Sequence, residues 1–258
     1  MNTTGYLGAL PDARPRIFAH RGLVYEGAKQ VVDENTIESF ERALEAGADY
    51  LETDLQVTKD GVVVLFHDSN LSRLAGSKES IASLAFSELE KIRLPFGGKI
   101  PTLQETLEKF PTAKFNLDFK NPSTEDPGMK LIIAAKAFDR VLVSSFSEPS
   151  RLRALAHSPV ELASSAGSSK VLQSYALARL KLDAQLTSVL KKVHAFQLPV
   201  RKYGIDFTHP RFVEAILNQD KEIHYWTVND PYEMRSLFSL GAHGIVTDRT
   251  DVAVKVFS

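Results

Sequence analysis

The chain has 258 residues, of which 43% are hydrophobic and 24% charged, and its formal net charge is −1. These values are typical of a soluble globular protein and indicate no basic surface for nucleic acid. The absence of cysteine excludes disulfides, thiolate metal ligands and a cysteine nucleophile. The N-terminus lacks the pattern of a signal peptide, and no apolar run reaches the ~20 residues that span a bilayer. We therefore expect a cytoplasmic protein without stable membrane insertion; its oligomeric state is not predicted.

Short β-rich runs alternate with helical stretches along the chain. The first predicted strand, 16–21, is followed by residues 35–47, whose apolar side chains recur at helical spacing. Two β-rich runs, 50–58 and 62–68, are joined by the turn signal at 59–61, and we count the second run as a continuation of the second strand. Later strands are expected over 113–120, 141–146, 160–164, 194–198, 222–229 and 244–248, and helices over 170–192 (whole or broken), 210–218 and 231–240.

Regular alternation of strands and helices predicts a parallel sheet with crossover helices. Eight such units in about 250 residues is the usual size of a closed (β/α)8 TIM barrel, which we predict as a single domain over residues 1–258. A doubly wound open sheet is the structural alternative. Residues 69–101 interrupt the rhythm after the second strand, so we predict that they form a small insertion or cap beside the site.

Ionisable residues fall at the ends of the first predicted strands, where a barrel places its functional side chains. His20 and Arg21 end the first strand. Glu52 and Asp54 are two positions apart in the second, so both carboxylates project to the same side. Two buried like charges at this separation repel each other unless a proton or a cation lies between them. A hard divalent cation, which prefers oxygen ligands, would satisfy the pair.

The following strands add a second histidine and a third carboxylate. His67 ends the run 62–68, and Asp118 and Lys120 form another pair two positions apart. Taken singly, each group has an ordinary explanation, such as a strand-capping histidine, a hydrated carboxylate pair or a surface ion pair. Together, two histidines, two cationic side chains and three carboxylates suit the hydrolysis of an anionic ester. Cations neutralise the charge on the ester, and histidines transfer protons to and from the reacting oxygens.

Several segments, in this order, resemble the glycerophosphodiester phosphodiesterase family. They are AHRG (19–22), ENT (34–36), ALEAGADYLETDLQVTKDGVVVLFHD (43–68), IPTLQETL (100–107), FNLDFK (115–120), YWTVND (225–230) and GAHGIVTDRTD (241–251). The resemblance implies a (β/α)8 barrel with one divalent cation, Mg²⁺ or Ca²⁺, at the C-terminal ends of the strands. It also implies a hydrolase of lipid and glycerol metabolism that converts glycerophosphodiesters (deacylated phospholipids) to glycerol 3-phosphate and an alcohol.

By position, the resemblance implies a role for each candidate residue. His20 and His67 match the family's general acid/base pair, Arg21 its phosphate-binding arginine, Lys120 a lysine near the phosphate, and Glu52, Asp54 and Asp118 its three metal ligands. Trp226 matches an aromatic wall against the alcohol part of the substrate, with ordinary barrel packing as the alternative.

Two departures from the family pattern concern the metal and the substrate. The family usually has Glu where this chain has Asp118, whose shorter side chain would reach the cation directly or through a water. The loop over 23–33 is longer than in the family, and we expect it to border the pocket. In the ENT segment, Asn35 or Thr36 is expected to cap the following helix, although contact of this segment with the substrate is an equal alternative.

Two other functions remain as alternatives. One is a phospholipase D-like enzyme that cleaves choline-bearing lipids and releases cyclic phosphates, although its secreted members usually carry disulfides that this chain cannot form. The other is a barrel that binds a phosphodiester without hydrolysing it, a role for which two proton-transferring histidines are unnecessary. For the hydrolase itself, attack by water and attack by a neighbouring hydroxyl of the substrate both fit the sequence.

Overall fold

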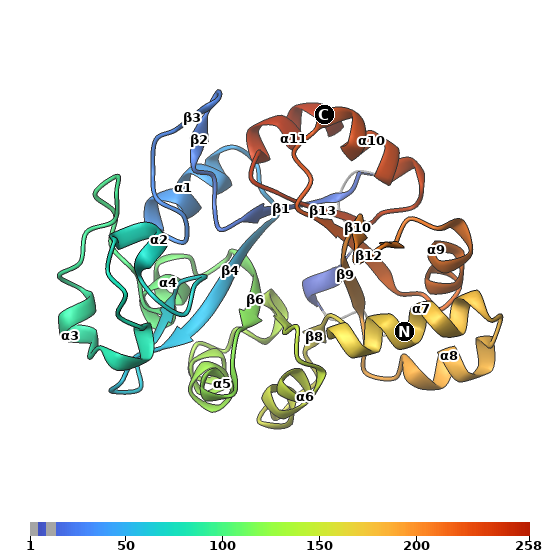
Figure 1. The fold of residues 1–258 in the computed structure, drawn as a ribbon, viewed down its shortest axis with the longest axis horizontal. Coiled ribbons are helices and arrows are strands. Elements are labelled where there is room, and N and C mark those ends of the chain that lie inside the picture. The colour runs from blue at the N-terminus through green and yellow to red at the C-terminus, as the bar shows by residue number, and fades with distance from the viewer. Residues whose placement is uncertain (1–4, 9–13) are drawn as a thin grey trace.

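The computed structural model describes residues 5–8 and 14–258, which form a ring of parallel strands surrounded by helices (Figure 1). Hydrogen bonds join the strands in the order β8-β7-β6-β4-β1-β13-β12-β9, and a parallel bridge from Ser165 to Ala195 nearly closes the ring. The predicted barrel is therefore confirmed. Its strands are β1 (Arg16–His20), β4 (Tyr50–Val57), β6 (Lys114–Phe119), β7 (Val141–Ser144), β8 (Ala163–Ser164), β9 (Ala195–Pro199), β12 (Glu222–Trp226) and β13 (Gly244–Thr247).

The β-rich run after the second strand does not continue that strand, so this part of the prediction was wrong. The run forms β5 (Val63–Leu65), which turns back and pairs antiparallel with β4. A turn of a few residues can only join antiparallel neighbours, because parallel ones need a crossover of about a dozen residues or more. Phe66 N donates to Asp54 O at 2.9 Å. The reversal therefore brings His67 back to the level of Asp54.

Helices cover the outside of the barrel, and the stretch predicted over 170–192 is broken into two. Thr36 caps α1: its Oγ1 accepts the Ser39 N–H, and Ser39 Oγ accepts the Thr36 N–H. The helices around the ring are α1 (Ile37–Glu45), α4 (Leu103–Lys109), α5 (Glu125–Ala134), α6 (Glu148–Ala156), α7 (Ser168–Arg179), α8 (Asp183–Val189), α9 (Pro210–Leu217), α10 (Pro231–Ser239) and α11 (Thr250–Phe257), with 3-10 turns η3 (Pro122–Thr124) and η4 (Phe138–Arg140).

Residues 69–101 contain α2 (Ser72–Ala75), η2 (Ile81–Ser83) and α3 (Phe86–Leu89). Apolar side chains of this segment pack with Val64 and Phe66 in a cluster separate from the main core. The loop over 23–33 contains the small hairpin β2 (Tyr25–Glu26) and β3 (Lys29–Gln30). It contacts the same segment, because Asp33 Oδ2 accepts the backbone N–H groups of Phe96 and Gly98, each at 3.0 Å.

The segment η1 (Gly5–Leu7) closes the end of the barrel at which the strands begin. Tyr50, at the start of β4, donates its hydroxyl to Tyr6 O at 2.7 Å. Arg16 and Glu222, which begin two other strands, form an ion pair at 2.7 Å. The rings of Tyr6 and Tyr50 pack with their centroids 4.8 Å apart. These contacts leave the opposite end, where the strands finish, for the site.

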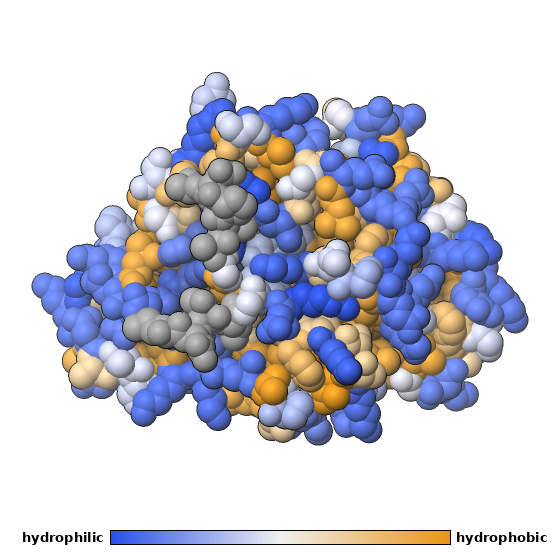
Figure 2. Space-filling view, turned by 180° about the vertical axis from the view of Figure 1, so that it is seen from behind, coloured by the Kyte–Doolittle hydropathy of each residue, from blue (hydrophilic) through white to orange (hydrophobic). Residues whose placement is uncertain are grey.

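Figure 2 shows the side of the molecule opposite to that in Figure 1, where hydrophilic side chains dominate and apolar ones form small separate groups. Within residues 5–8 and 14–258, no helix is long and apolar enough to cross a membrane. The N-terminal stretch for which we expect no signal peptide lies partly outside the described residues.

Candidate active site

The eight residues proposed from the sequence line one cavity at the end of the barrel where the strands finish. The cavity has a volume of about 260 Å³. Parallel strands place their carboxyl ends at the same edge, which explains why residues far apart in the sequence meet there. The residues that the cavity brings together are His20, Arg21, Glu52, Asp54, His67, Asp118, Lys120 and Trp226. None of residues 23–33 is in its lining, so the expectation that this loop borders the pocket was wrong.

Lys120 bridges two of the three carboxylates. Its Nζ lies 2.7 Å from Asp54 Oδ1 and 2.6 Å from Asp118 Oδ2. The strand register explains the contact, because Asp54 and Asp118 are direct partners on β4 and β6, and Lys120 follows on the same face. Burial alone would raise the pKa of Asp54, but the charges of Lys120 and Arg21 outweigh it and lower the pKa to about 2. Asp54 is therefore ionised across the physiological range.

Nearby positive charges compensate the charge of Glu52 much less than that of Asp54. It is buried, and its Oε2 accepts the Arg21 backbone N–H at 3.3 Å. Burial and the negative charge of Asp54 raise the pKa of Glu52 to about 7. Burial also raises the pKa of Asp118, despite its contact with Lys120. The carboxylate cluster is therefore short of positive charge.

A hard divalent cation would supply that charge. Glu52, Asp54 and Asp118 offer only oxygen donors, which suit Mg²⁺ or Ca²⁺. In the part of the chain that the structure describes, no three acidic or histidine side chains already converge as a metal site. Lys120 instead lies between Asp54 and Asp118, so an incoming ion would compete with its ammonium for the same oxygens.

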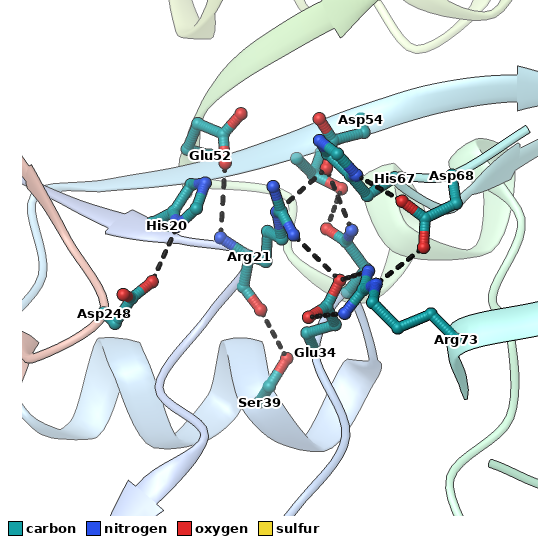
Figure 3. A network of polar contacts seen from close by, with 12 residues as sticks. His20, Arg21, Glu34, Ser39, Glu52, Asp54, His67, Asp68, Arg73 and Asp248 are labelled. Carbon is teal, nitrogen blue, oxygen red and sulfur yellow. Dashed lines mark hydrogen bonds and ion pairs between the residues drawn. The ribbon is translucent and has the colours of Figure 1, made fainter. Parts of the chain in front are cut away.

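The first histidine is held by the carboxylate of Asp248, the residue that directly follows the last strand (Figure 3). His20 Nδ1 lies 2.6 Å from Asp248 Oδ1, and Asn229 Nδ2 donates to Asp248 Oδ2 at 2.8 Å. A carboxylate there accepts the Nδ1–H, which leaves Nε2 to exchange a proton with a ligand. Burial works to lower the pKa of His20, but the Asp248 hydrogen bond and the charge of Glu52 raise it above its usual value.

The second histidine has the same arrangement. His67 Nδ1 lies 2.7 Å from Oδ1 of its neighbour Asp68, which leaves Nε2 for proton exchange. Asp68 in turn accepts from Arg73 Nε at 2.7 Å. Despite partial burial, the His67 and Arg73 contacts lower the pKa of Asp68, so it remains ionised and keeps the imidazole oriented.

Arg21 owes its position to an unusual backbone turn. Arg21 itself has φ 59°, and Gly22 follows at φ 87°. A Cβ at Gly22 would lie 2.3 Å from Ser39 Oγ, so only glycine allows α1 to pack this closely. The Arg21 guanidinium lies 3.0 Å from Glu34 Oε1 and 3.4 Å from Asp54 Oδ2. It therefore stands beside the carboxylate cluster with a fixed positive charge.

Arg73, from the segment 69–101, connects these two parts of the site (Figure 3). Its Nη1 and Nη2 donate to the two oxygens of Glu34 at 2.9 and 2.6 Å, while its Nε donates to Asp68. Glu34 pairs with Arg21, and Asp68 pairs with His67. The Arg73 guanidinium thus holds both the partner of Arg21 and the partner of His67.

The ENT segment both caps a helix and contacts the site. Thr36, not Asn35, is the N-cap of α1. Asn35 adopts φ 54° and donates Nδ2 to Asp54 Oδ2 at 3.1 Å, while its Oδ1 accepts from Thr53 at 2.7 Å. The segment therefore holds a carboxylate of the site in place.

Trp226 and two amide side chains complete the lining. The Trp226 ring meets Phe146 edge to face, with centroids 5.8 Å apart. Asn116 Nδ2 donates to Gln197 Oε1 at 3.2 Å, but Asn116 Oδ1 and Gln197 Nε2 are buried without a partner among the described residues. These free amide atoms can accept from and donate to hydroxyl groups of a ligand.

Sequence reasoning missed several of these supporting residues. Asp248 and Asn229 lie within segments that match the family, but nothing in their spacing connects them with His20. Arg73 carries no local signal, since it lies in the segment that breaks the strand and helix rhythm. Asp68 directly follows His67 in the sequence, but no role was predicted for it.

A nearly closed ring of parallel strands with ionisable side chains at their carboxyl ends is the arrangement of the TIM-barrel enzymes. Within that class, the pattern of the glycerophosphoryl diester phosphodiesterase family matches residues 20–252. The chain belongs to this family.

Individual proteins agree with that assignment. The probable glycerophosphodiester phosphodiesterase 2 of Mycobacterium tuberculosis is 34% identical over 218 residues, which are 84% of this chain and 83% of the relative. The glycerophosphodiester phosphodiesterase of Thermotoga maritima has a crystal structure that superposes with a TM-score of 0.73 at 25% identity, covering 95% of this chain and 99% of that one. The phosphodiesterase of Oleispira antarctica, solved with its product sn-glycerol-3-phosphate, shares the fold with a TM-score of 0.73 at 22% identity, over 94% and 96% of the two chains.

Proposed function

We propose that this protein hydrolyses glycerophosphodiesters to glycerol 3-phosphate and an alcohol, with His20 and His67 as general acid and base. One observation carries the proposal: both histidines have Nδ1 held by a carboxylate and line the same cavity as Arg21. The family and the name of the mycobacterial relative support the reaction class. Release of glycerol 3-phosphate from glycerophosphocholine, glycerophosphoethanolamine or glycerophosphoglycerol is the test. Folded protein that releases none from any of them, with Mg²⁺, Ca²⁺ or Mn²⁺ present, would contradict it.

In this proposal, one histidine removes a proton from the nucleophile at Nε2, and the other protonates the leaving alcohol oxygen. Arg21 and Lys120 neutralise the phosphate oxygens. Asn116 and Gln197 offer their free amide atoms to the hydroxyls of the substrate. The nucleophile is water or a neighbouring substrate hydroxyl, and phosphorus NMR of the reaction mixture distinguishes them, because the second route passes through a cyclic phosphate.

We also propose that Glu52, Asp54 and Asp118 hold one divalent cation, Mg²⁺ or Ca²⁺. The support is the oxygen-only donor set and the raised pKa of Glu52. When bound, such an ion adds positive charge where the phosphoryl group becomes more negative. Asp118 would reach the ion directly or through a water, and crystals soaked with Mn²⁺ would distinguish these by anomalous scattering.

The Asp248→Asn variant should lower turnover roughly 10- to 100-fold or more, by analogy with the loss of a carboxylate that orients a metal-ligating histidine. The Asp248 hydrogen bond raises the pKa of His20, so its removal should lower that pKa. The limb of the pH–rate profile set by His20 should therefore move to lower pH. Asp251→Asn, which removes the ion-pair partner of Arg249 outside the cavity, is the matched control. An unchanged pH–rate profile for Asp248→Asn would show that Asp248 does not support the reaction.

The Arg73→Met variant should lower kcat/KM about tenfold. Without Arg73, Glu34 would form its ion pair with Arg21 alone. Arg21 would then bind the phosphate more weakly, and KM would rise. Asp68 would lose its hydrogen bond from Arg73. It would then orient His67 less firmly, and kcat would fall. Arg73→Lys should recover part of both effects, and Arg249→Met is the control. A merely structural role would lower the melting temperature but leave KM and kcat of the folded enzyme unchanged.

A second candidate substrate is a diester that carries an acyl chain. Val171, Leu172 and Ile205 line the cavity from α7 and β11 (Ile205–Asp206), in the half of the barrel away from β4. Such side chains suit a hydrocarbon better than a polyol. Comparison of lysophospholipids in vesicles with water-soluble diesters distinguishes the two, since faster turnover of the lipid would favour this candidate.

We further propose that residues 1–258 act as one domain, with 69–101 as a small insertion that supports the site through Arg73, and that the protein works in the cytoplasm. The packing of this segment on Val64 and Phe66 supports the first point. A single cooperative unfolding transition would be its test, and cell fractionation tests the location.

A further inference from the structure

An aromatic cage lies at the mouth of the cavity, and it already contains a cation. Lys202 belongs to the hairpin of β10 (Arg201–Lys202) and β11, which directly follows β9, the partner strand of β12 (Figure 1). Its Nζ is 5.4 Å from the ring centroids of Phe146, Tyr203 and Trp226 alike. All these residues line the same cavity as the candidate catalytic histidines.

The three rings come from separate parts of the chain and converge on one ammonium. Phe146 follows β7, Trp226 ends β12, and Tyr203 occupies the hairpin turn with φ 51°. Phe146 is 52% exposed and Tyr203 is 91% exposed, so the cage opens toward solvent. A cage of aromatic faces within about 6 Å of one point is the arrangement by which proteins bind quaternary ammonium groups.

Lys202 has an aromatic environment instead of an acidic one. Across the residues that the structure describes, no carboxylate lies within ion-pair distance of its Nζ, whereas Arg21 and Lys120, the other arginine and lysine of the cavity, each have one. A second ammonium is close, because Lys120 Nζ lies 5.7 Å from the ring of Phe146. The mouth is thus positively charged as well as aromatic.

We propose that Lys202 determines which alcohol the substrate carries. Its ammonium occupies the cage that would otherwise receive a quaternary ammonium, and it repels a second cation. The cavity therefore selects diesters whose alcohol is uncharged or anionic, such as a polyol, over those that carry choline. The selection among substrates rests on the proposed function, but the position of the Lys202 ammonium in the aromatic cage does not.

Trp226 is the one tryptophan of the chain, so its fluorescence reports directly on the cage. Choline titrated into Lys202→Met should change that fluorescence at concentrations about tenfold lower than in the wild type. Lys202→Arg should behave like the wild type, because it keeps the cation. Lys191→Met, which changes an exposed lysine on another segment, is the control for lost surface charge. Equal choline titrations in wild type and Lys202→Met would overturn the proposal.

Kinetics provide the second readout. In the wild type, kcat/KM for glycerophosphoglycerol should exceed that for glycerophosphocholine, and Lys202→Met should reduce this ratio about tenfold. A ratio that does not change, with both substrates turned over, would overturn the proposal and leave the proposed function intact. No turnover of either substrate by the wild type, together with tighter choline binding by Lys202→Met, would overturn the proposed function and leave the cage assignment standing.

Discussion

Replacement of His20 or His67 by Gln should each reduce turnover of a glycerophosphodiester by about 10²–10⁴-fold, the usual contribution of a positioned acid or base. The reason is geometric. Each imidazole has Nδ1 fixed by a carboxylate, so Nε2 is the nitrogen available to exchange a proton in the cavity. Glutamine keeps a polar side chain of similar size but cannot transfer a proton. Initial rates under saturating substrate and metal measure the effect.

The matched control is His157→Gln. His157 is exposed at the end of α6, outside the cavity, so its replacement should leave turnover unchanged. Circular dichroism should show that all variants are folded. Near-normal turnover in both His20→Gln and His67→Gln would contradict the assignment of acid and base, whatever the substrate.

Glu52→Gln should abolish metal-restored activity yet stabilise the metal-free protein at alkaline pH. Burial and Asp54 raise the pKa of Glu52 from 4.5 to about 7. The unfolded chain therefore loses this proton above pH 4.5, but the folded protein loses it only above pH 7. Between these values, stability falls as pH rises, by on the order of 3 kcal/mol at most. Glutamine is neutral at every pH and avoids this loss.

The measurement is the melting temperature of chelator-treated protein at pH 5 and pH 8. The Glu52→Gln variant should melt several degrees higher than the wild type at pH 8, with little difference at pH 5. Glu148→Gln is the control of opposite sign. Although burial opposes it, the contacts of Glu148 with Arg151 and Gly167 lower its pKa, so its charge stabilises the fold above pH 4.5. Its replacement should therefore destabilise at pH 8. A Glu52→Gln variant that melts lower than the wild type at pH 8 would contradict the charge imbalance.

Much of the fold and site could be predicted because their signals are local. The i, i+2 spacing of Glu52 and Asp54 fixes both side chains on one face of a strand, and the structure places both in the cavity. Parallel strands then bring the ends of β1, β4 and β6 together without further information. The Thr36 cap was predicted as one of two choices, because capping depends only on nearby residues.

The remainder depends on contacts between distant side chains. The ion pairs of Lys120 with Asp54 and Asp118 follow from cross-strand register, which the sequence does not show. Asp248 reaches His20 across 228 positions of sequence. The cage around Lys202 requires three separate segments of the chain to converge. No periodicity or motif encodes these distances, so only a three-dimensional arrangement shows them.

The central claim is that the carboxylate cluster and the paired histidines form one metal-dependent phosphodiesterase site. The most direct test follows glycerol 3-phosphate release from glycerophosphoglycerol by protein stripped with chelator and resupplied with Mg²⁺, Ca²⁺ or Mn²⁺. We predict that release stops on stripping, returns with at least one ion, and does not return in Glu52→Gln. Release that persists without metal, or that Glu52→Gln retains in full, would contradict the claim.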